Sequence, residues 1–139
     1  MTDQKRPEPC VGALIFYDNK ALFVKSHKWK GKYTISGGHI ELGETLESAL
    51  KREVREETGL EIYKLRFISF QEFIYDDAFW KRKHYIFFDF ACEAKSNNVN
   101  LNSEGQEYKW AYLSDALKNM DIEPYTKRTI EHYIDKFQE

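Results

Sequence analysis

Three glutamates stand close together near the middle of the chain and could bind a divalent metal ion. They are Glu53, Glu56 and Glu57. Carboxylate oxygens are the ligands that hard cations such as Mg²⁺ prefer. A cation would also offset the repulsion and the desolvation that grouped carboxylates suffer. The chemistry that this pattern indicates is the binding of a hard divalent cation by carboxylate oxygens.

The glutamates must be held by a helix, which the flanking residues predict over 46–58. Thr45 suits the N-cap, and Gly59 suits a left-handed C-cap. Helical spacing gives this segment an apolar face that extends toward the glutamates. That face consists of Leu46, Ala49, Leu50 and Val54. The carboxylates are therefore expected on or beside the buried side of the helix.

An exposed helix with surface ion pairs is the alternative explanation for these charges. Glu47 and Lys51, for example, are four residues apart, as in such pairs. This alternative does not explain the wider pattern, in which Gly38 and Glu44 precede the run from Arg52 to Leu60 at fixed spacing. The wider pattern favours a functional site.

The segment 38–60 resembles the Nudix box, the signature of a hydrolase family that cleaves nucleoside diphosphates linked to another group. The resemblance implies bound Mg²⁺, with Mn²⁺ as an alternative. The metal ligands that it implies are Glu53, Glu56, Glu57 and the backbone carbonyl of Gly37. One departure is visible, because the family often has proline where this chain has Ser36. We expect that change to remove a rigid turn residue and no catalytic group.

The resemblance also implies roles for other residues of the segment. Arg52 and Glu44 match positions that form an orienting ion pair, which would hold the helix against the preceding loop. Gly38 and Gly59 match the glycines of the signature. Either Glu53 or Glu104, from a later loop, would be the base for the attacking water, and we favour metal binding for Glu53. A solvent-exposed Glu104 without a role is an equal alternative.

Length and composition indicate one soluble domain. The chain has 139 residues, of which 42% are hydrophobic and 16% aromatic, enough for one core. A formal net charge of −2 argues against a general nucleic-acid or membrane-surface binder. Without an apparent signal peptide or membrane span, a cytoplasmic location is the expectation, as a monomer or homodimer. Cys10 and Cys92 lie in apolar runs and are expected to be buried and reduced.

Strands are predicted on both sides of the central helix. They cover 10–16, 21–26, 33–36, 61–75 and 84–93, with loops at 76–83 and 95–103. The apolar run 84–93 should be central, and its Asp89 needs a partner. Helices are predicted over 113–120 and, after Pro124, over 125–137. This order predicts an α/β fold, an α/β/α sandwich with a mixed sheet, as the Nudix resemblance also implies.

A small-molecule nucleotide is the expected substrate. Secondary similarities to a nucleoside triphosphatase subgroup imply conversion of a nucleoside triphosphate, with a pyrimidine deoxynucleotide favoured, to the monophosphate and pyrophosphate. They lie at 35–38, 85–92, 104–110 and 125–129. Aromatic side chains could stack on the base, although a core role is favoured for each. These are Tyr17, Phe73, Tyr75, Trp80 and Tyr85.

Basic residues could contact the phosphates, but each has a simpler explanation. Lys25 is better explained as a solvated strand end, and Lys81 to Lys83 as a charged loop before an apolar strand. Two other functions stay open. One is hydrolysis of another diphosphate derivative, such as ADP-ribose, a nucleotide sugar or a dinucleoside polyphosphate. The other is a non-catalytic nucleotide-binding module, which the intact set of box glutamates disfavours.

Overall fold

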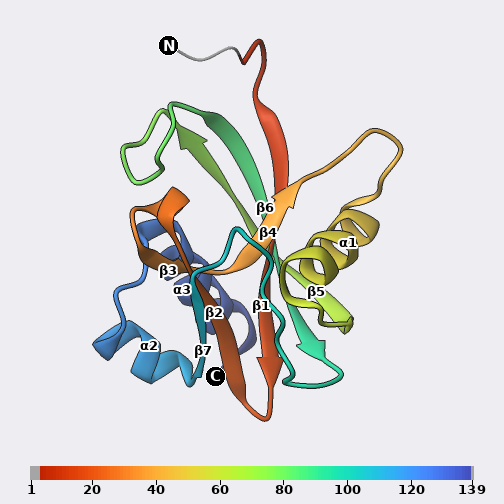
Figure 1. Ribbon diagram of the computed structural model, residues 1–139, viewed down its shortest axis with the longest axis vertical. Helices are drawn as coiled ribbons and strands as arrows, with labels where there is room; N and C mark the ends of the chain where they lie inside the picture. Colours follow the sequence, from red (N-terminus) through yellow and green to blue (C-terminus); the bar gives the residue numbers. More distant parts are fainter. Residues whose placement is uncertain (1–3, 139) are drawn as a thin grey trace.

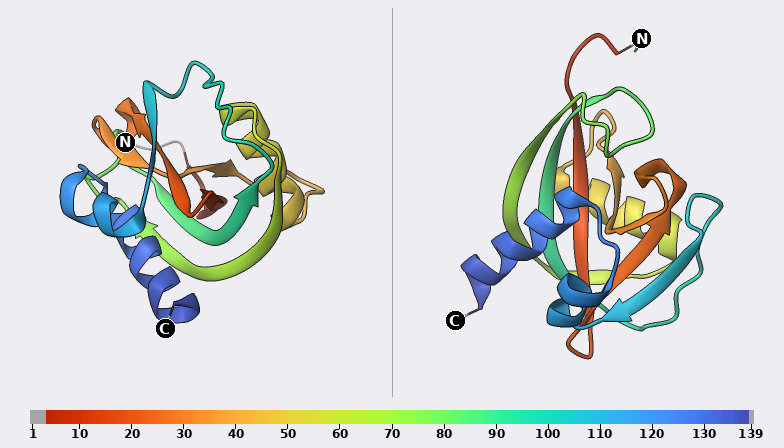
Figure 2. Two further views of the ribbon diagram at one scale, coloured as in Figure 1. Left: turned by 90° about the horizontal axis from the view of Figure 1, so that it is seen from below. Right: turned by 90° about the vertical axis from the view of Figure 1, so that its left-hand side faces the viewer.

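A strongly curved sheet with helices on both faces forms the molecule (Figures 1 and 2). The computed structural model describes residues 4–138. Its strands are β1 (Glu8–Tyr17), β2 (Lys20–Ser26), β3 (Lys32–Thr34), β4 (Ser36–His39), β5 (Ile62–Ile74), β6 (His84–Ala94) and β7 (Glu107–Ala111). Its helices are the short 3-10 turn η1 (His27–Trp29), α1 (Leu46–Thr58), α2 (Leu113–Asn119) and α3 (Pro124–Phe137).

The sheet is mixed and β1 is its organising strand. The strand order is β3-β2-β1-β6-β5, with β4 paired to β1 and β7 paired to β2. β1 runs parallel to β6 and antiparallel to β2 and β4. Its pairing with β2 covers only the hairpin end, and β4 takes its place beside residues 10–13. β4 therefore reaches the middle of the sheet, directly before the segment that leads into α1.

Alternation along β1 separates two cores. Val11, Ala13 and Ile15 point to one face, where they pack against α1. Leu14 points to the other face, where it packs with residues of α3 such as Ile130. Figure 2 shows α1 and α3 on opposite sides of the sheet. These layers are those of the predicted α/β/α sandwich.

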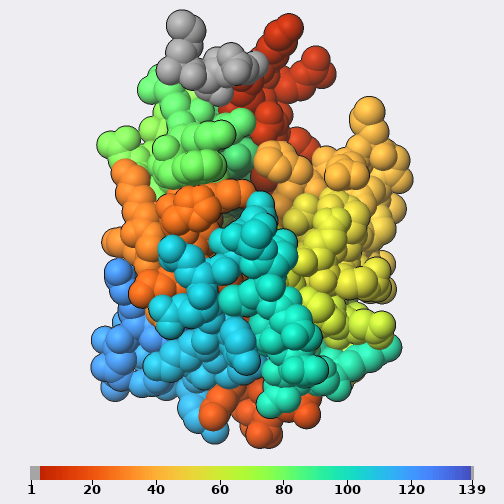
Figure 3. Space-filling model, viewed as in Figure 1, coloured from red at the N-terminus to blue at the C-terminus, as the bar shows by residue number. Residues whose placement is uncertain are grey.

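The segment between β6 and β7 covers one side of the molecule. In Figure 3 this teal-to-cyan segment lies between α1 in yellow and the orange 3-10 turn and β3 region. Backbone hydrogen bonds fasten it to the end of α1, from Asn100 N to Thr58 O (2.8 Å) and from Asn102 N to Glu57 O (3.1 Å). Glu104 is thereby held near the helix that carries the glutamates.

The structure confirms most predicted elements. α1 spans residues 46–58 with Thr45 and Gly59 as its caps, and Gly59 has φ of 75°. β6 lies between β1 and β5, and Cys10 and Cys92 are buried free thiols. None of the helices within residues 4–138 has the length and apolar character needed to cross a bilayer.

Two sequence predictions were wrong. The single strand at 33–36 is two strands, β3 and β4, which pair with different neighbours. No strand was predicted after 84–93, whereas Glu107 and Trp110 belong to β7, where Trp110 lies opposite Leu22 of β2. β7 has only five residues and carries charges, so its sequence lacks the apolar run that identifies a buried strand; pairing with β2 supplies what local propensity does not.

Candidate active site

Arg52 connects the loop before α1 to the carboxylates on the helix. Its Nε and Nη2 donate to the two oxygens of Glu44, at 2.6 and 2.9 Å. Nη2 also donates to the backbone carbonyl of His39 (2.9 Å), and Nη1 donates to Glu53 (3.0 Å). The two-pronged contact fixes the plane of the guanidinium group. The paired positions predicted from the sequence, Arg52 and Glu44, thus lie in direct contact.

Glu57 is held by the strand that precedes the helix. Ser36 Oγ donates to Glu57 Oε1 (2.9 Å), and the backbone N–H of Gly37 donates to the same oxygen (3.3 Å). Gly37 must be glycine because a Cβ there would collide with the backbone oxygen of Val11. The sequence analysis assigned no role to Ser36, yet its hydroxyl is the side-chain donor to this carboxylate.

Glu53 lies against the backbone of Gly38. A Cβ at Gly38 would collide with the Glu53 carboxylate, so glycine is what allows this approach. The Glu53 side chain is only 16% exposed, and Arg52 is its ion-pair partner. Burial raises the pKa of Glu53, although the hydrogen bond from Arg52 opposes that effect.

Burial and mutual repulsion disfavour the ionised forms of the glutamates that lie in this cluster. Burial, with a smaller contribution from Glu53, raises the pKa of Glu57 to about 8, while Ser36 lowers it only in part. The hydrogen bonds from Arg52 instead lower the pKa of Glu44 to about 2. Glu44 is therefore a permanent anion that orients Arg52, whereas Glu57 needs further positive charge to ionise readily near neutral pH.

Glu56 lies apart from the other two helix glutamates. Its side chain is 54% exposed and contacts Arg52 Nη1 at 3.3 Å, on the outer side of the guanidinium group. Across residues 4–138, no three His, Cys, Asp or Glu side chains converge closely enough to hold a metal in their present conformations. The structure therefore brings together Glu53 and Glu57 but leaves Glu56 outside.

Glu104 reaches the same region from the segment after β6. Its carboxylate is 2.7 Å from Lys28 Nζ, in an ion pair whose side chains are 50% and 32% exposed. Lys28 belongs to the 3-10 turn between β2 and β3. Among the basic residues considered from the sequence were Lys25 and Lys81 to Lys83, and this lysine was not identified as part of the site.

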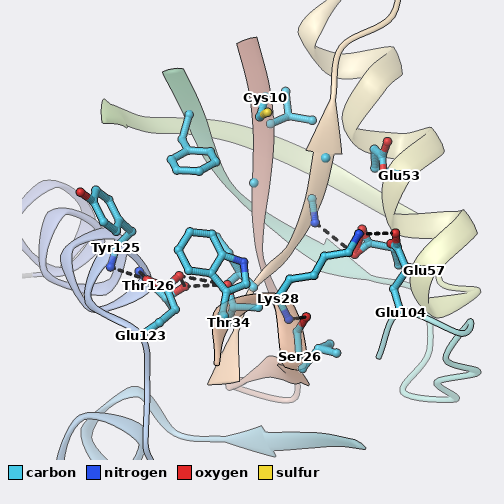
Figure 4. Close-up of a pocket in the computed structure, with 18 of the residues that line it drawn as sticks. Cys10, Ser26, Lys28, Thr34, Glu53, Glu57, Glu104, Glu123, Tyr125 and Thr126 are labelled. Atoms are coloured by element: carbon cyan, nitrogen blue, oxygen red, sulfur yellow. Dashed lines mark hydrogen bonds and ion pairs between the residues drawn. The ribbon is translucent and has the colours of Figure 1, made fainter. Parts of the chain in front are cut away.

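One pocket connects these groups to a second cluster on the α3 side of the sheet (Figure 4). Its volume is about 250 Å³. Figure 4 shows Glu53, Glu57 and Glu104 at one side, Thr34, Glu123 and Thr126 at the other, and Lys28 extending toward the acidic side. The pocket is also lined by Gly12, Gly37, Gly38, Trp29, Gln71, Phe79, Tyr85, Phe87, Asp89, Tyr125 and Thr129.

Buried polar side chains occupy the second end. Asp89, 3% exposed, accepts hydrogen bonds from Gln71 (3.1 Å) and Thr129 (3.0 Å). These are the partners that the sequence analysis required without naming them. Burial raises the pKa of Asp89 to about 7. A buried carboxylic acid in a pocket is a candidate for ligand recognition.

Most of the aromatic candidates for base stacking lie outside the pocket, and the favoured core role is confirmed for Phe73 and Tyr85. Of the five candidates for base stacking only Tyr85 lines the pocket; Phe73 is fully buried, Tyr17 packs beside Trp110, and Tyr75 and Trp80 border a separate surface depression. The aromatic walls are instead Trp29, Phe79, Phe87 and Tyr125. They are distant in sequence, so only the fold reveals that they share a cavity.

The basic candidates lie outside the pocket as well. Lys25 pairs with Glu107 at 3.2 Å. Lys81 lies over Trp80 and Arg82 over Tyr75 on the loop between β5 and β6, and Lys83 is 4.0 Å from Glu8. Lys28 is the lysine that lines the pocket.

Comparison with known proteins identifies the family of the chain. The family model described as the NUDIX domain matches residues 6–133. The chain belongs to the Nudix hydrolase family. Among curated relatives, the nucleoside triphosphatase NudI of Enterobacter sp. strain 638 is 34% identical over 105 residues, which cover 71% of this chain and 74% of the relative. The protein of the same name from Escherichia coli K12 is 33% identical over 106 residues, covering 72% and 74%.

Solved Nudix structures share the fold. The MutT Nudix hydrolase from Burkholderia pseudomallei superimposes with a TM-score of 0.78 at 22% identity, covering 92% of this chain and 98% of that one. The Nudix domain of Shewanella oneidensis NrtR, solved in complex with ADP ribose, has a TM-score of 0.77 at 20% identity, covering 96% and 90%. The loop and helix that carry Glu44, Arg52, Glu53, Glu56 and Glu57 are the segment that resembles the Nudix box.

Proposed function

We propose that this Nudix hydrolase converts a nucleoside triphosphate to the monophosphate and pyrophosphate with the help of Mg²⁺. The observation that carries the proposal is the single pocket that joins the box carboxylates to an aromatic-walled end lined by buried polar groups. A phosphate chain at the acidic end would leave the nucleoside at the aromatic end. The names of the NudI relatives support the same substrate class.

The residues at the acidic end fit a hard divalent cation. Glu53 and Glu57 line the pocket, and burial raises the pKa of both carboxyls. A cation that they share would remove the cost of ionising them there. Glu56 could join them by leaving Arg52, and the backbone carbonyl of Gly37 is the fourth proposed ligand. Mn²⁺ fits the same oxygen donors. Bound there, the metal would neutralise phosphate oxygens and make an attacking water more acidic.

The chain's own residues position the reacting groups. Arg52, fixed by Glu44, holds Glu53 in place. Lys28, which forms an ion pair with Glu104, would be attracted to the phosphate chain, and its movement would free the Glu104 carboxylate. Glu104 is on a loop segment within reach of the same pocket, which suits it to accept a proton from the attacking water. We therefore assign metal binding to Glu53 and base catalysis to Glu104.

The test is pyrophosphate release by the purified protein. Each of the common nucleoside and deoxynucleoside triphosphates would be supplied with Mg²⁺, with Mn²⁺ and with EDTA, and ADP-ribose would serve as the comparison substrate. We expect metal-dependent release of pyrophosphate from triphosphates, lost in Glu57→Gln. Turnover of ADP-ribose alone would replace the substrate class, and metal-independent turnover would overturn the proposed metal site.

A further inference from the structure

The two ends of the Gln71 side-chain amide, on β5, differ in their hydrogen bonding. Its Nε2 lies within hydrogen-bond distance of three acceptors: Asp89 Oδ2 at 3.1 Å, the backbone oxygen of Tyr125 at 3.0 Å and Thr129 Oγ1 at 3.0 Å. The three acceptors fix which end of the amide faces β6 and α3. Its Oε1 is buried and has no hydrogen-bond partner within residues 4–138. Gln71 itself is 7% exposed and lines the pocket.

A buried carbonyl oxygen without a hydrogen-bond partner costs free energy. It therefore indicates a place where a ligand could donate a hydrogen bond. Leaving such a group without a partner costs roughly 1–3 kcal/mol, so folded proteins rarely keep one without a reason. Gln71 is fixed by contacts that involve its nitrogen, so rotation of the amide would place its oxygen against the Asp89 carboxylate. A ligand that donates a hydrogen bond would satisfy Oε1 without disturbing those contacts.

Asp89 offers a second acceptor at the same place. Within the described chain, the hydrogen bonds to its carboxylate, from Gln71 and Thr129, end on Oδ2. Oδ1 lies beside Gly12 on the neighbouring strand β1, where a Cβ would stand 2.5 Å from Oδ1 and 3.1 Å from Ile35 Cδ1. Glycine at this position therefore keeps the space in front of Oδ1 open.

Glu123, the other buried carboxylate of this end, is in a different situation. Its Oε1 accepts from the backbone N–H groups of Tyr125 and Thr126, which caps α3. Its Oε2 accepts from the hydroxyls of Thr126 (2.7 Å) and Thr34 (3.0 Å). All of these bonds serve the fold. Glu123 is therefore a helix cap rather than a group that awaits a ligand.

We propose that Gln71 and Asp89 recognise the amino group of a nucleobase, so that this enzyme prefers amino-bearing bases to their carbonyl counterparts. The inference rests on the proposed function, because it places the nucleoside at this end of the pocket. An exocyclic amino group has two hydrogens, which match Gln71 Oε1 and Asp89 Oδ1. Uracil and thymine have a carbonyl oxygen where cytosine has the amino group, and that oxygen would face two acceptors.

The walls of this end of the pocket are aromatic. Phe87 and Trp29, with ring centroids 6.1 Å apart, line it together with Tyr125 and Phe79. Aromatic faces accept any base, so they contribute affinity without selecting among bases. Discrimination among bases must therefore come from the polar side chains Gln71 and Asp89, which we call the polar floor of the pocket. Gly12 belongs to both regions, since it pairs with Asp89 on β6 and with Gly37 on β4, beside the box.

Matched substrates that differ at one position test the inference. The specificity constants for dCTP and dUTP, and for dATP and dITP, would be compared at pH 8. Burial raises the pKa of Asp89 to about 7, so the carboxylate is mainly ionised at that pH. In the pair that is hydrolysed more efficiently, we expect the specificity constant of the amino-bearing substrate to exceed that of its carbonyl counterpart by roughly 10-fold or more. With the carbonyl substrate the site would keep an unpaired polar group.

Two nearly isosteric variants test whether Gln71 and Asp89 cause the preference for the amino-bearing substrate. In Asp89→Asn and Gln71→Met the ratio between amino and carbonyl substrates should fall to near one or reverse. Ratios within one variant are insensitive to the fraction of folded enzyme. Asp135→Asn, an exposed position on α3, is the matched control and should leave the ratio unchanged.

The outcomes separate this inference from the proposed function. Triphosphate hydrolysis without preference for the amino substrate, or with a preference that both variants retain, overturns the inference alone. If no triphosphate is hydrolysed, the proposed function fails. Binding of dCMP and dUMP, measured by calorimetry in EDTA at pH 8, then decides the inference: tighter dCMP binding that Asp89→Asn abolishes supports it, and equal affinities overturn it.

Discussion

Ser36 donates a hydrogen bond of 2.9 Å to Glu57, across the junction between β4 and the box helix. The family often has proline at this position, and the sequence alone suggested only the loss of a rigid turn. The structure shows a gain, because the hydroxyl stabilises the ionised form of a buried carboxylate. Ser36 and the N–H of Gly37 together keep Glu57 pointed into the pocket.

Ser36→Ala should weaken metal use in a pH-dependent way. The hydrogen bond from Ser36 lowers the pKa of Glu57, so its removal raises that pKa further. We expect the pH at which half-maximal Mg²⁺-dependent activity appears to move upward by about one pH unit, with recovery at high pH. Mg²⁺ titrations of activity from pH 6.5 to 9.5 measure the change.

Ser114→Ala, at an exposed position of α2, is the control for the serine substitution. It should follow the wild-type profile. A Ser36→Ala profile that coincides with that of the wild type would show that the hydroxyl does not influence metal binding by Glu57.

Glu57→Gln should stabilise the protein when no metal is present. The pKa of Glu57 is about 8 in the folded protein against an ordinary value of 4.5, so the folded state binds the extra proton between these limits. Its contribution to stability is complete below pH 4.5 and is lost as the pH rises to about 8. The glutamine variant should therefore melt at a higher temperature than the wild type at pH 8 in EDTA, by several degrees.

Thermal melts from pH 4 to 9, with EDTA or with Mg²⁺, check this expectation. Mg²⁺ should raise the melting temperature of the wild type and leave that of Glu57→Gln nearly unchanged, because the variant lacks a ligand charge. Glu47→Gln, on the exposed side of α1, is the matched control. Equal metal stabilisation of wild type and Glu57→Gln would remove Glu57 from the metal site.

The box helix could be predicted because its information is local. Capping residues and apolar spacing define Leu46 to Thr58, and helical geometry then places Glu53 and Glu57 one turn apart on the side that meets the sheet. The contact between Arg52 and Glu44 was expected from the resemblance to the Nudix signature, and it joins residues only eight positions apart. Resemblance to the Nudix signature supplied the expected roles.

The aromatic end of the pocket could not be predicted in the same way. Gln71, Asp89 and Thr129 come from β5, β6 and α3, and their contacts depend on strand register and on how α3 crosses the sheet. Asp89 stood out in an apolar strand, but no local pattern names the partners of a buried charge. Glu56 shows the converse: helical position placed it near the site, while its rotamer turned it toward Arg52.

Arg52→Lys should reduce activity through loss of orientation rather than charge. Lysine keeps the positive charge but cannot contact Glu44 through two parallel hydrogen bonds while reaching Glu53 and the carbonyl of His39. We expect kcat to fall by about 10-fold to 100-fold, as for the loss of a supporting contact to a metal ligand. The melting temperature should also fall, since the loop before α1 loses its anchor.

Arg55→Lys, on the exposed side of the same helix, tests whether any arginine change on α1 has this effect. The control should retain wild-type kcat and stability. If Arg52→Lys is as active as the control, the two-pronged contact with Glu44 is dispensable for catalysis.

Glu104→Gln tests whether this residue is the base, and Lys28 provides the comparison that makes the result specific. The two side chains form an ion pair of 2.7 Å, so either substitution breaks the same contact. If Glu104 accepts a proton from the attacking water, Glu104→Gln should lower kcat by roughly 100-fold or more, with little change in KM. Lys28→Met should instead raise KM for the triphosphate and largely preserve kcat, because Lys28 attracts the phosphate chain. Steady-state kinetics at saturating Mg²⁺ separate the two patterns. A small loss in Glu104→Gln that resembles the effect of Lys28→Met would mean that the pair only shapes the pocket, and base catalysis would then return to Glu53.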